Sequence, residues 1–176
     1  MKTLKFRFCA FVLLILVHIC AFAQNGVVFL SYGIDGREYP RYFNKEQVFS
    51  SFGQPIRNEH ILLECGSSLP FYPESDWEKR DDLNIWLLKY KFVVFEANLK
   101  KAAVYSLDLR SEKNYIKFDN FLVNKRTTLQ RLLKQGGRVV AKNTVFLIDR
   151  NSDDGSGFVF TIKKGQVVAV KPLNAC

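Results

Sequence analysis

The sequence predicts an α+β fold in which two repeats, each a short helix followed by antiparallel strands, form one sheet with both helices packed on one face. Two observations lead to this prediction. Two stretches combine an N-terminal cap, helical apolar spacing and a glycine stop, and several short β-rich runs follow each of them. The pair Asn44-Lys45 that opens the first stretch recurs 80 positions later as Asn124-Lys125, with matching apolar residues after it.

The first repeat is expected over residues 24–121. Asn44 is a favourable N-cap and Gln47 can complete a capping box, so a helix is predicted over Asn44–Phe52. An irregular stretch near residues 66–82 is taken as an inserted loop, because it holds prolines and many charged residues. The strands expected in this repeat are Val27–Ser31, Ile61–Leu63, Ile85–Leu88, Phe92–Phe95, Ala103–Leu109 and Tyr115–Phe121.

The second repeat is expected over residues 122–176. Its helix is predicted to begin at the cap Asn124, to carry an apolar stripe as far as Leu133 and to end at Gly136-Gly137. Lys163-Lys164-Gly165 reads as a hairpin turn. The strands expected here are Thr144–Ile148, Gly157–Ile162 and Gln166–Val170.

Residues 1–23 have the pattern of a cleavable signal peptide. Basic residues precede an uncharged apolar run, which closes on Ala21-Phe22-Ala23, so cleavage is expected before Gln24. The apolar run is short for a membrane anchor, and the bulky Ile19 before Cys20 disfavours a lipoprotein. An exported protein is therefore predicted, either periplasmic or extracellular.

The composition restricts the partners of the mature chain. Removing the three basic residues of the leader lowers the net charge from +9 to about +6, and the remaining basic residues are scattered. A nucleic-acid surface needs a continuous basic stripe, so no nucleic-acid partner is expected. No transmembrane span is predicted in the mature chain, while loose attraction to an anionic envelope surface stays open.

The chemistry-bearing residues are few. Cys65 and Cys176 are the two cysteines of the mature chain; a disulfide between them is favoured, and two free thiols are the alternative. His60 is its single histidine, so sites that need two histidines are excluded. We expect no enzyme activity, no cofactor and no metal site. The stretch 149–155 resembles a calcium loop, but its glycine falls one place late and a solvated turn is preferred.

Aromatic residues gather in the first repeat and are the candidate binding residues. They are Phe71, Tyr72, Trp77, Trp86 and Tyr90. Exposed aromatic side chains are common binding hot spots, whereas packing within the sheet is the alternative. Carboxylates crowd the neighbouring stretch 74–82, which leaves a small glycan-active or other hydrolase as an alternative function.

The segment from Asn44 to Pro55, Asn-Lys-Glu-Gln-Val-Phe-Ser-Ser-Phe-Gly-Gln-Pro, resembles the opening helix of SmpA/OmlA-like and β-lactamase-inhibitor-protein-like modules. The resemblance covers Asn44–Tyr105 and, with departures, Asn124–Val170; the chain is also similar to secreted Bacteroidetes-type proteins of unassigned role. It implies a tandem α+β module that binds proteins without catalysis. The leading hypothesis is thus an exported module that binds an unknown protein partner through a sheet face or the inserted loop. A structural accessory of the cell envelope is a further alternative.

Overall fold

The computed structural model describes residues 26–61, 69, 85–152 and 155–173. Several of the residues and segments singled out in the sequence lie outside the described residues. They are the leader 1–23, Cys65, Cys176, Phe71, Tyr72, Trp77 and the acidic stretch 74–82. No helix in the described part of the chain is long and apolar enough to cross a membrane.

The larger sheet has nine antiparallel strands, eight of them in one continuous path. The order along the path is β10 (Arg138–Ala141), β11 (Thr144–Ile148), β12 (Gly157–Lys163), β13 (Gln166–Leu173), β7 (Lys101–Asp108), β6 (Val93–Ala97), β5 (Ile85–Lys89) and β4 (Arg57–Ile61). The ninth strand, β3 (Tyr42–Asn44), pairs with the first three residues of β7, Lys101 to Ala103. Two sets of four consecutive strands therefore meet at the β7–β13 pair, where Leu107 lies opposite Val170.

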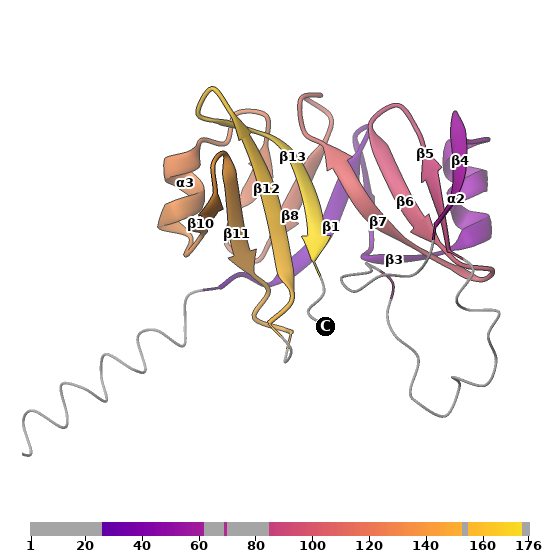
Figure 1. The fold of residues 1–176 in the computed structure, drawn as a ribbon, viewed down its shortest axis with the longest axis horizontal. Helices are drawn as coiled ribbons and strands as arrows, with labels where there is room; N and C mark the ends of the chain where they lie inside the picture. The colour runs from indigo at the N-terminus through magenta and orange to yellow at the C-terminus, as the bar shows by residue number, and fades with distance from the viewer. Residues whose placement is uncertain (1–25, 62–68, 70–84, 153–154, 174–176) are drawn as a thin grey trace, which may run out of the picture.

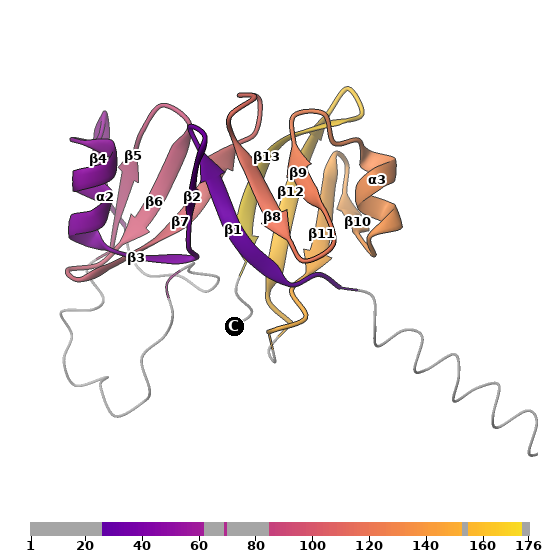
Figure 2. The same cartoon turned by 180° about the vertical axis from the view of Figure 1, so that it is seen from behind.

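The smaller sheet has four strands in the order β2 (Arg37–Tyr39), β1 (Phe29–Ile34), β8 (Tyr115–Phe118) and β9 (Leu122–Asn124). It lies behind the middle of the larger sheet in Figure 1 and in front of it in Figure 2. The pairing of β1 with β8 joins segments more than 80 positions apart in the sequence, with Gly33 opposite Tyr115. The result is a layered β structure.

The predicted fold class is wrong. Strand accounts for 56% of the structure and helix for 11%, so the fold is β-rich and not α+β. The expectation of one sheet with helices on one face also fails, because the smaller sheet forms the second layer and the two short helices lie at opposite ends of the molecule (Figures 1 and 2). Helices of eight and six residues are only about 12 and 9 Å long, too short to cover a nine-stranded sheet.

The first helix, α2 (Lys45–Phe52), confirms the prediction made from its cap. The backbone N–H of Asn44 donates to the side-chain Oε1 of Gln47 at 2.9 Å, and the backbone N–H of Gly53 closes the last turn on Phe49. Val48 is buried, and the ring of Phe52 packs 5.1 Å from that of Phe95 on β6. The short helix is thus held by its cap and by aromatic packing at one end of the sheet.

The second helix, α3 (Leu129–Lys134), begins later than the sequence predicts. Asn124 ends β9, and its side chain accepts a bond from the backbone N–H of Arg126 at 3.0 Å, which makes a turn. Thr128 is the N-cap and accepts from the backbone N–H of Arg131 at 3.3 Å. An asparagine is favourable both in turns and at helix caps, and here the turn prevails.

The expected strands are largely recovered, although β1 and β8 end at other residues than predicted. Thr144–Ile148 is confirmed as β11, and the turn Lys163-Lys164-Gly165 is confirmed between β12 and β13. The predicted strand Ile61–Leu63 is confirmed at Ile61, while residues 62 and 63 lie outside the described part of the chain; β4 begins earlier, over the mostly polar residues Arg57–Ile61. An edge strand that is largely solvated lacks the apolar alternation by which strands are recognised.

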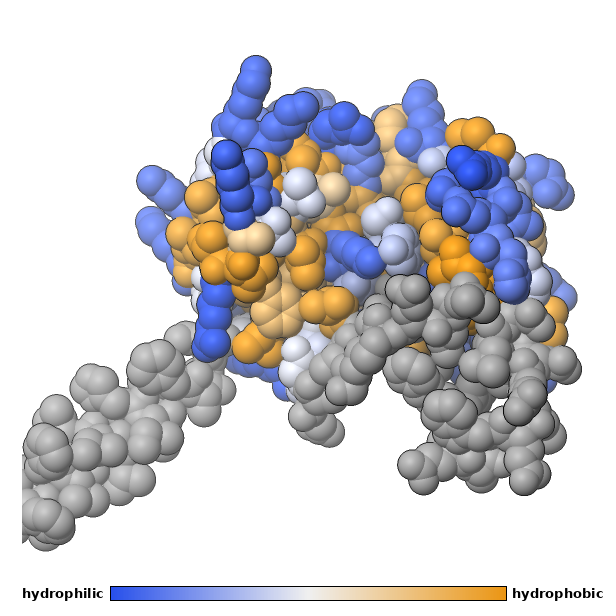
Figure 3. Space-filling model, in the orientation of Figure 1, coloured by the Kyte–Doolittle hydropathy of each residue, from blue (hydrophilic) through white to orange (hydrophobic). Residues whose placement is uncertain are grey.

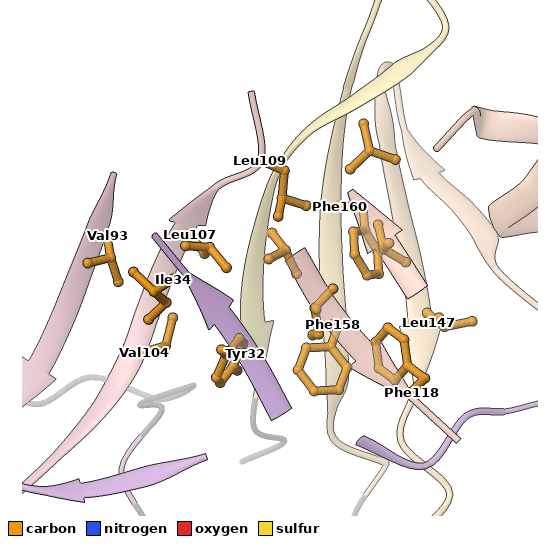
Figure 4. Packing of buried hydrophobic residues seen from close by; sticks show 14 of the residues in the cluster. Tyr32, Ile34, Val93, Val104, Leu107, Leu109, Phe118, Leu147, Phe158 and Phe160 are labelled. Carbon is orange, nitrogen blue, oxygen red and sulfur yellow. The ribbon is translucent and has the colours of Figure 1, made fainter. Parts of the chain in front are cut away.

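The core lies between the two sheets. Figure 4 shows Ile34 of β1 beside Val93, Val104 and Leu107 of the larger sheet. It also shows Tyr32 and Phe118 of the smaller sheet beside Phe158. The rings of Phe118 and Phe158 meet edge to face with centroids 5.2 Å apart. Each strand contributes alternate residues to this layer, so the opposite side of the larger sheet carries the remaining ones.

Tyr32 links this core to an expected pH dependence. Its side chain is fully buried, and burial raises the pKa of its phenol above the ordinary value of 10.0. As the pH rises above about 10, the unfolded chain loses the phenol proton while the folded chain keeps it, so stability falls by up to about 1.4 kcal/mol per pH unit. Tyr32→Phe should remove this loss. Urea unfolding at about pH 8 and about pH 11 measures it, with the exposed Tyr42→Phe as control. An equal alkaline loss in parent and Tyr32→Phe would contradict the assignment.

Candidate functional site

The outer face of the larger sheet, the face turned away from the smaller sheet, carries an apolar surface over strands β11 to β13. Register fixes its members, because residues directly opposite each other on paired strands face the same side. Phe146 lies opposite Val159, and Val159 lies opposite Lys171. We name this surface the outer patch and define it by Phe146, Ile148, Val159, Ala169 and Leu173.

The residues of the outer patch are accessible to solvent. Leu173 is among the exposed large apolar residues, and the other four are partly buried by one another rather than by another layer. Figure 3 views this face and shows apolar surface gathered over the β10–β13 half. Gly157 shapes the patch, since a Cβ there would meet the ring of Phe146 at 2.9 Å and the carbonyl oxygen of Leu147 at 2.3 Å. The absence of a side chain lets the Phe146 ring lie flat against the sheet.

The other half of the same face is closed. Leu69 packs there against Ile85 and Ala103, which are both buried, and against Ile61 at the edge. Residues Ile61 and Ile85 are paired across β4 and β5, so they belong to one face. The two halves of the sheet thus differ: Leu69 packs on the outer face of β4, β5 and β7, and no described residue packs on the outer patch.

Charged residues border the outer patch. Arg138 lies opposite Phe146 and Lys163 follows Thr161 by two positions on β12, so both face outward. The ammonium of Lys171 donates to the hydroxyl of Tyr105 at 2.8 Å and lies 4.0 Å from that ring centroid. These three cations give the border of the patch a positive charge.

Among the described residues, Asp108 is an acidic side chain on this face, and it is already engaged. Asp108 lies opposite Ala169. The guanidinium of Arg110 donates to both of its carboxylate oxygens, from Nε at 3.0 Å and from Nη2 at 2.5 Å. This hydrogen bonding holds the pKa of the Asp108 carboxyl below its ordinary value. Asp108 is therefore ionised at neutral pH and neutralised by Arg110, and it does not offset the cations around the patch.

The two described residues of the predicted aromatic cluster lie elsewhere. Trp86 is on β5, half-buried, with the ammonium of Lys45 4.5 Å from its ring centroid and the His60 ring 5.6 Å away, edge to face. The hydroxyl of Tyr90 donates to the carbonyl of Gly53 at 3.0 Å, and its ring meets Phe95 edge to face. Both pack against the core cluster, where Tyr90 ties the end of α2 to the sheet.

The described residues hold no group of three or more histidine, cysteine, aspartate or glutamate side chains that could bind a metal ion. Asp149, the first residue of the calcium-like stretch, is buried, and its Oδ2 accepts from Nη1 of Arg41 at 2.9 Å. Its Oδ1 accepts from the backbone N–H of Asn151 at 3.2 Å. The carboxylate of Asp149 is therefore held by a protein cation and a turn, and residues 153 and 154 of this stretch lie outside the described residues.

The sequence contained a signal for the outer patch that its interpretation missed. Phe146 and Val159 alternate with buried residues on strands that read as continuously apolar, because both faces of these strands carry apolar side chains. Such strands are expected in a sheet covered on both sides. Here the smaller sheet covers one side, and no described layer covers the other. No protein-family model matches the chain, and no curated protein or solved structure is significantly similar to it.

Proposed function

We propose that the chain is an exported, non-enzymatic module that binds a protein partner through the outer patch. The observation that carries the proposal is a contrast on one sheet face: Leu69 packs over Ile85 and Ala103, whereas no described residue packs over the outer patch. Contiguous apolar surface with a polar border is typical of protein-binding sites.

The partner is expected to bring an apolar surface with acidic residues at its border. Arg138 and Lys163 lie at the border of the patch, Lys171 lies between Ala169 and Leu173 on its β13 side, and the described carboxylate of Asp108 is neutralised by Arg110. Complementary charge guides encounter and selects among partners more than it adds affinity. Apolar burial at the centre would then supply most of the binding free energy.

Two parts of this proposal, export and the lack of catalysis, are supported by sequence features. The basic, apolar and Ala-x-Ala segments of residues 1–23 support export. His60 is the one histidine of the mature chain, and it lies exposed on the edge strand β4 with its ring against Trp86. This position supports a packing role for His60 rather than a catalytic one.

A charge placed in the outer patch should weaken partner binding strongly. Val159→Lys puts an ammonium at the centre of the patch without touching the core, so capture of the partner from the producing cell's envelope or secreted fraction should weaken at least about tenfold. Leu99→Lys makes the same change at another exposed apolar residue, in the β6–β7 turn, and serves as the matched control. Binding is measured by quantitative pull-down with immobilised exported protein.

The proposal requires that one captured protein is retained by the parent and by Leu99→Lys and lost by Val159→Lys. Equal retention by all three proteins would show that the partner binds elsewhere. Loss by both variants would point to general damage, which unfolding curves of the two variants resolve.

A further inference from the structure

The free edge of β10 is the part of the fold that the proposed function leaves unused. β10 ends the strand path of the larger sheet, and among the described residues only β11 pairs with it. All four of its residues are exposed. An unpaired strand edge presents backbone N–H and C=O groups that can pair with another extended chain.

The charge around this edge has a single sign. Residues 120–148 contain no aspartate or glutamate, while four cations lie on α3, β10 and the turn after it. They are Arg131, Lys134, Arg138 and Lys142. None of these four forms an ion pair with another described residue, whereas Lys125 and Arg126, just before α3, both pair with Glu112. Figure 1 shows α3 beside β10, so the cations of both elements share one end of the molecule.

Exposed apolar side chains accompany these cations. Val139 is 60% exposed, Val140 58% and Leu133 at the end of α3 40%. β-branched residues on a strand pack well against a neighbouring strand. The edge therefore combines free backbone groups, β-branched side chains and uncompensated positive charge.

The opposite edge of the sheet provides an internal comparison. On β4, the carboxylate of Glu59 accepts from the ammonium of Lys89 at 2.6 Å and lies 3.7 Å from Arg57. Both signs of charge are present there, because one carboxylate pairs with two cations. Mixed charge of this kind protects an edge from pairing, while the β10 edge lacks the acidic half of it.

We propose that the β10 edge docks an extended acidic segment of the protein partner, which adds as a further strand to the larger sheet. This inference rests on the proposed function, since it names how the same partner is held. A second copy of the chain is disfavoured as the occupant, because pairing β10 with itself would bring Arg138 and Lys142 of two molecules together. A nucleic acid could pair its phosphates with the cations, but it would not form the strand hydrogen bonds with the β10 backbone or the apolar contacts with the valines.

The test uses a fluorescent peptide of about eight residues that alternates glutamate with valine, titrated with the exported protein and followed by anisotropy. The glutamate peptide should bind, and the same peptide with lysine for glutamate should not. Affinity should fall as salt is raised. The variant Arg138→Glu should weaken binding about tenfold or more, whereas Lys164→Glu in the β12–β13 turn, the matched control, should leave it unchanged.

Two N-methylated versions of the peptide separate strand addition from simple charge attraction. In a strand, alternate residues direct their N–H groups to opposite edges, so methylating one alternate set blocks one edge only. Strand addition predicts that one methylated peptide loses binding and the other retains it. Equal binding by both would mean that the peptide is held by charge alone, which contradicts strand addition. Binding of a single-stranded oligonucleotide without binding of the glutamate peptide would also overturn the proposal.

The peptide experiment and the partner-capture experiment can fail independently of each other. Val159→Lys lies in the outer patch and should leave peptide binding intact while it abolishes partner capture. If the peptide does not bind but capture depends on Val159, the strand-addition inference is wrong and the outer patch still holds. If the peptide binds as predicted but capture does not depend on Val159, the outer patch is wrong.

Discussion

Phe158→Ala is expected to lower the free energy of unfolding by about 3–5 kcal/mol. Phe158 is completely buried on the inner side of β12, where it stacks on Phe29 at 5.5 Å and meets Phe118 edge to face at 5.2 Å. It touches both strands of the smaller sheet that lie over it, so its removal leaves a cavity between the two layers. Equilibrium unfolding in urea measures the change.

Phe146→Ala is the matched control for this prediction. It removes the same side chain from the neighbouring strand, but from the outer face, where the ring is partly exposed and lies over Gly157. Its cost should be less than half that of Phe158→Ala, because less apolar surface is lost and no closed cavity forms. Equal costs would mean that the two faces of β11 and β12 are buried alike, contrary to the layered fold.

Asp149→Ala is expected to cost about 3 kcal/mol. The Asp149 carboxylate is 1% exposed, whereas the Arg41 guanidinium, which donates to it at 2.9 Å, is 23% exposed and lies 5.5–5.6 Å from the ring centroids of Phe29 and Phe158. Removing the carboxylate leaves this charge among aromatic rings without its partner. A fully buried unpaired charge costs about 3–5 kcal/mol, and the partial exposure of Arg41 places the expected value at the lower end.

A double-mutant cycle isolates the ion pair. Arg41→Met keeps most of the apolar contact with the rings and removes the charge, so the double variant Arg41→Met, Asp149→Ala should be more stable than Asp149→Ala alone. Thermal and urea unfolding of the four proteins give the coupling energy. Additive single effects would contradict a direct interaction between the two side chains.

Local features of the fold could be predicted from sequence, whereas its layering could not. The helix Lys45–Phe52 was predictable because Asn44 and Gln47 form a capping box whose geometry depends on adjacent residues. Strand Thr144–Ile148 was predictable from β-branched and aromatic residues. The smaller sheet depends on the pairing of Phe29–Ile34 with Tyr115–Phe118, and apolar alternation identifies strands without identifying their partners.

The candidate site was predictable only in part. Aromatic excess directed attention to Trp86 and Tyr90, which pack against the core instead of forming a described binding surface. The short edge strand Arg138–Ala141 was missed because two valines between cations make too brief a pattern. The absence of acidic residues over 120–148 was visible in the sequence, but its meaning depends on the three-dimensional position of α3 and β10 at one sheet edge.

Amide hydrogen exchange of the protein, alone and with a partner captured as proposed, tests the binding site most directly. The account predicts slower exchange on binding at Arg138–Ala141, where the free edge becomes paired, and at Thr144–Ile148 and Gly157–Lys163 beneath the outer patch. Strand Arg57–Ile61 at the opposite edge should exchange as before. Protection confined to Arg57–Ile61, with none over β10 to β12, would contradict the account.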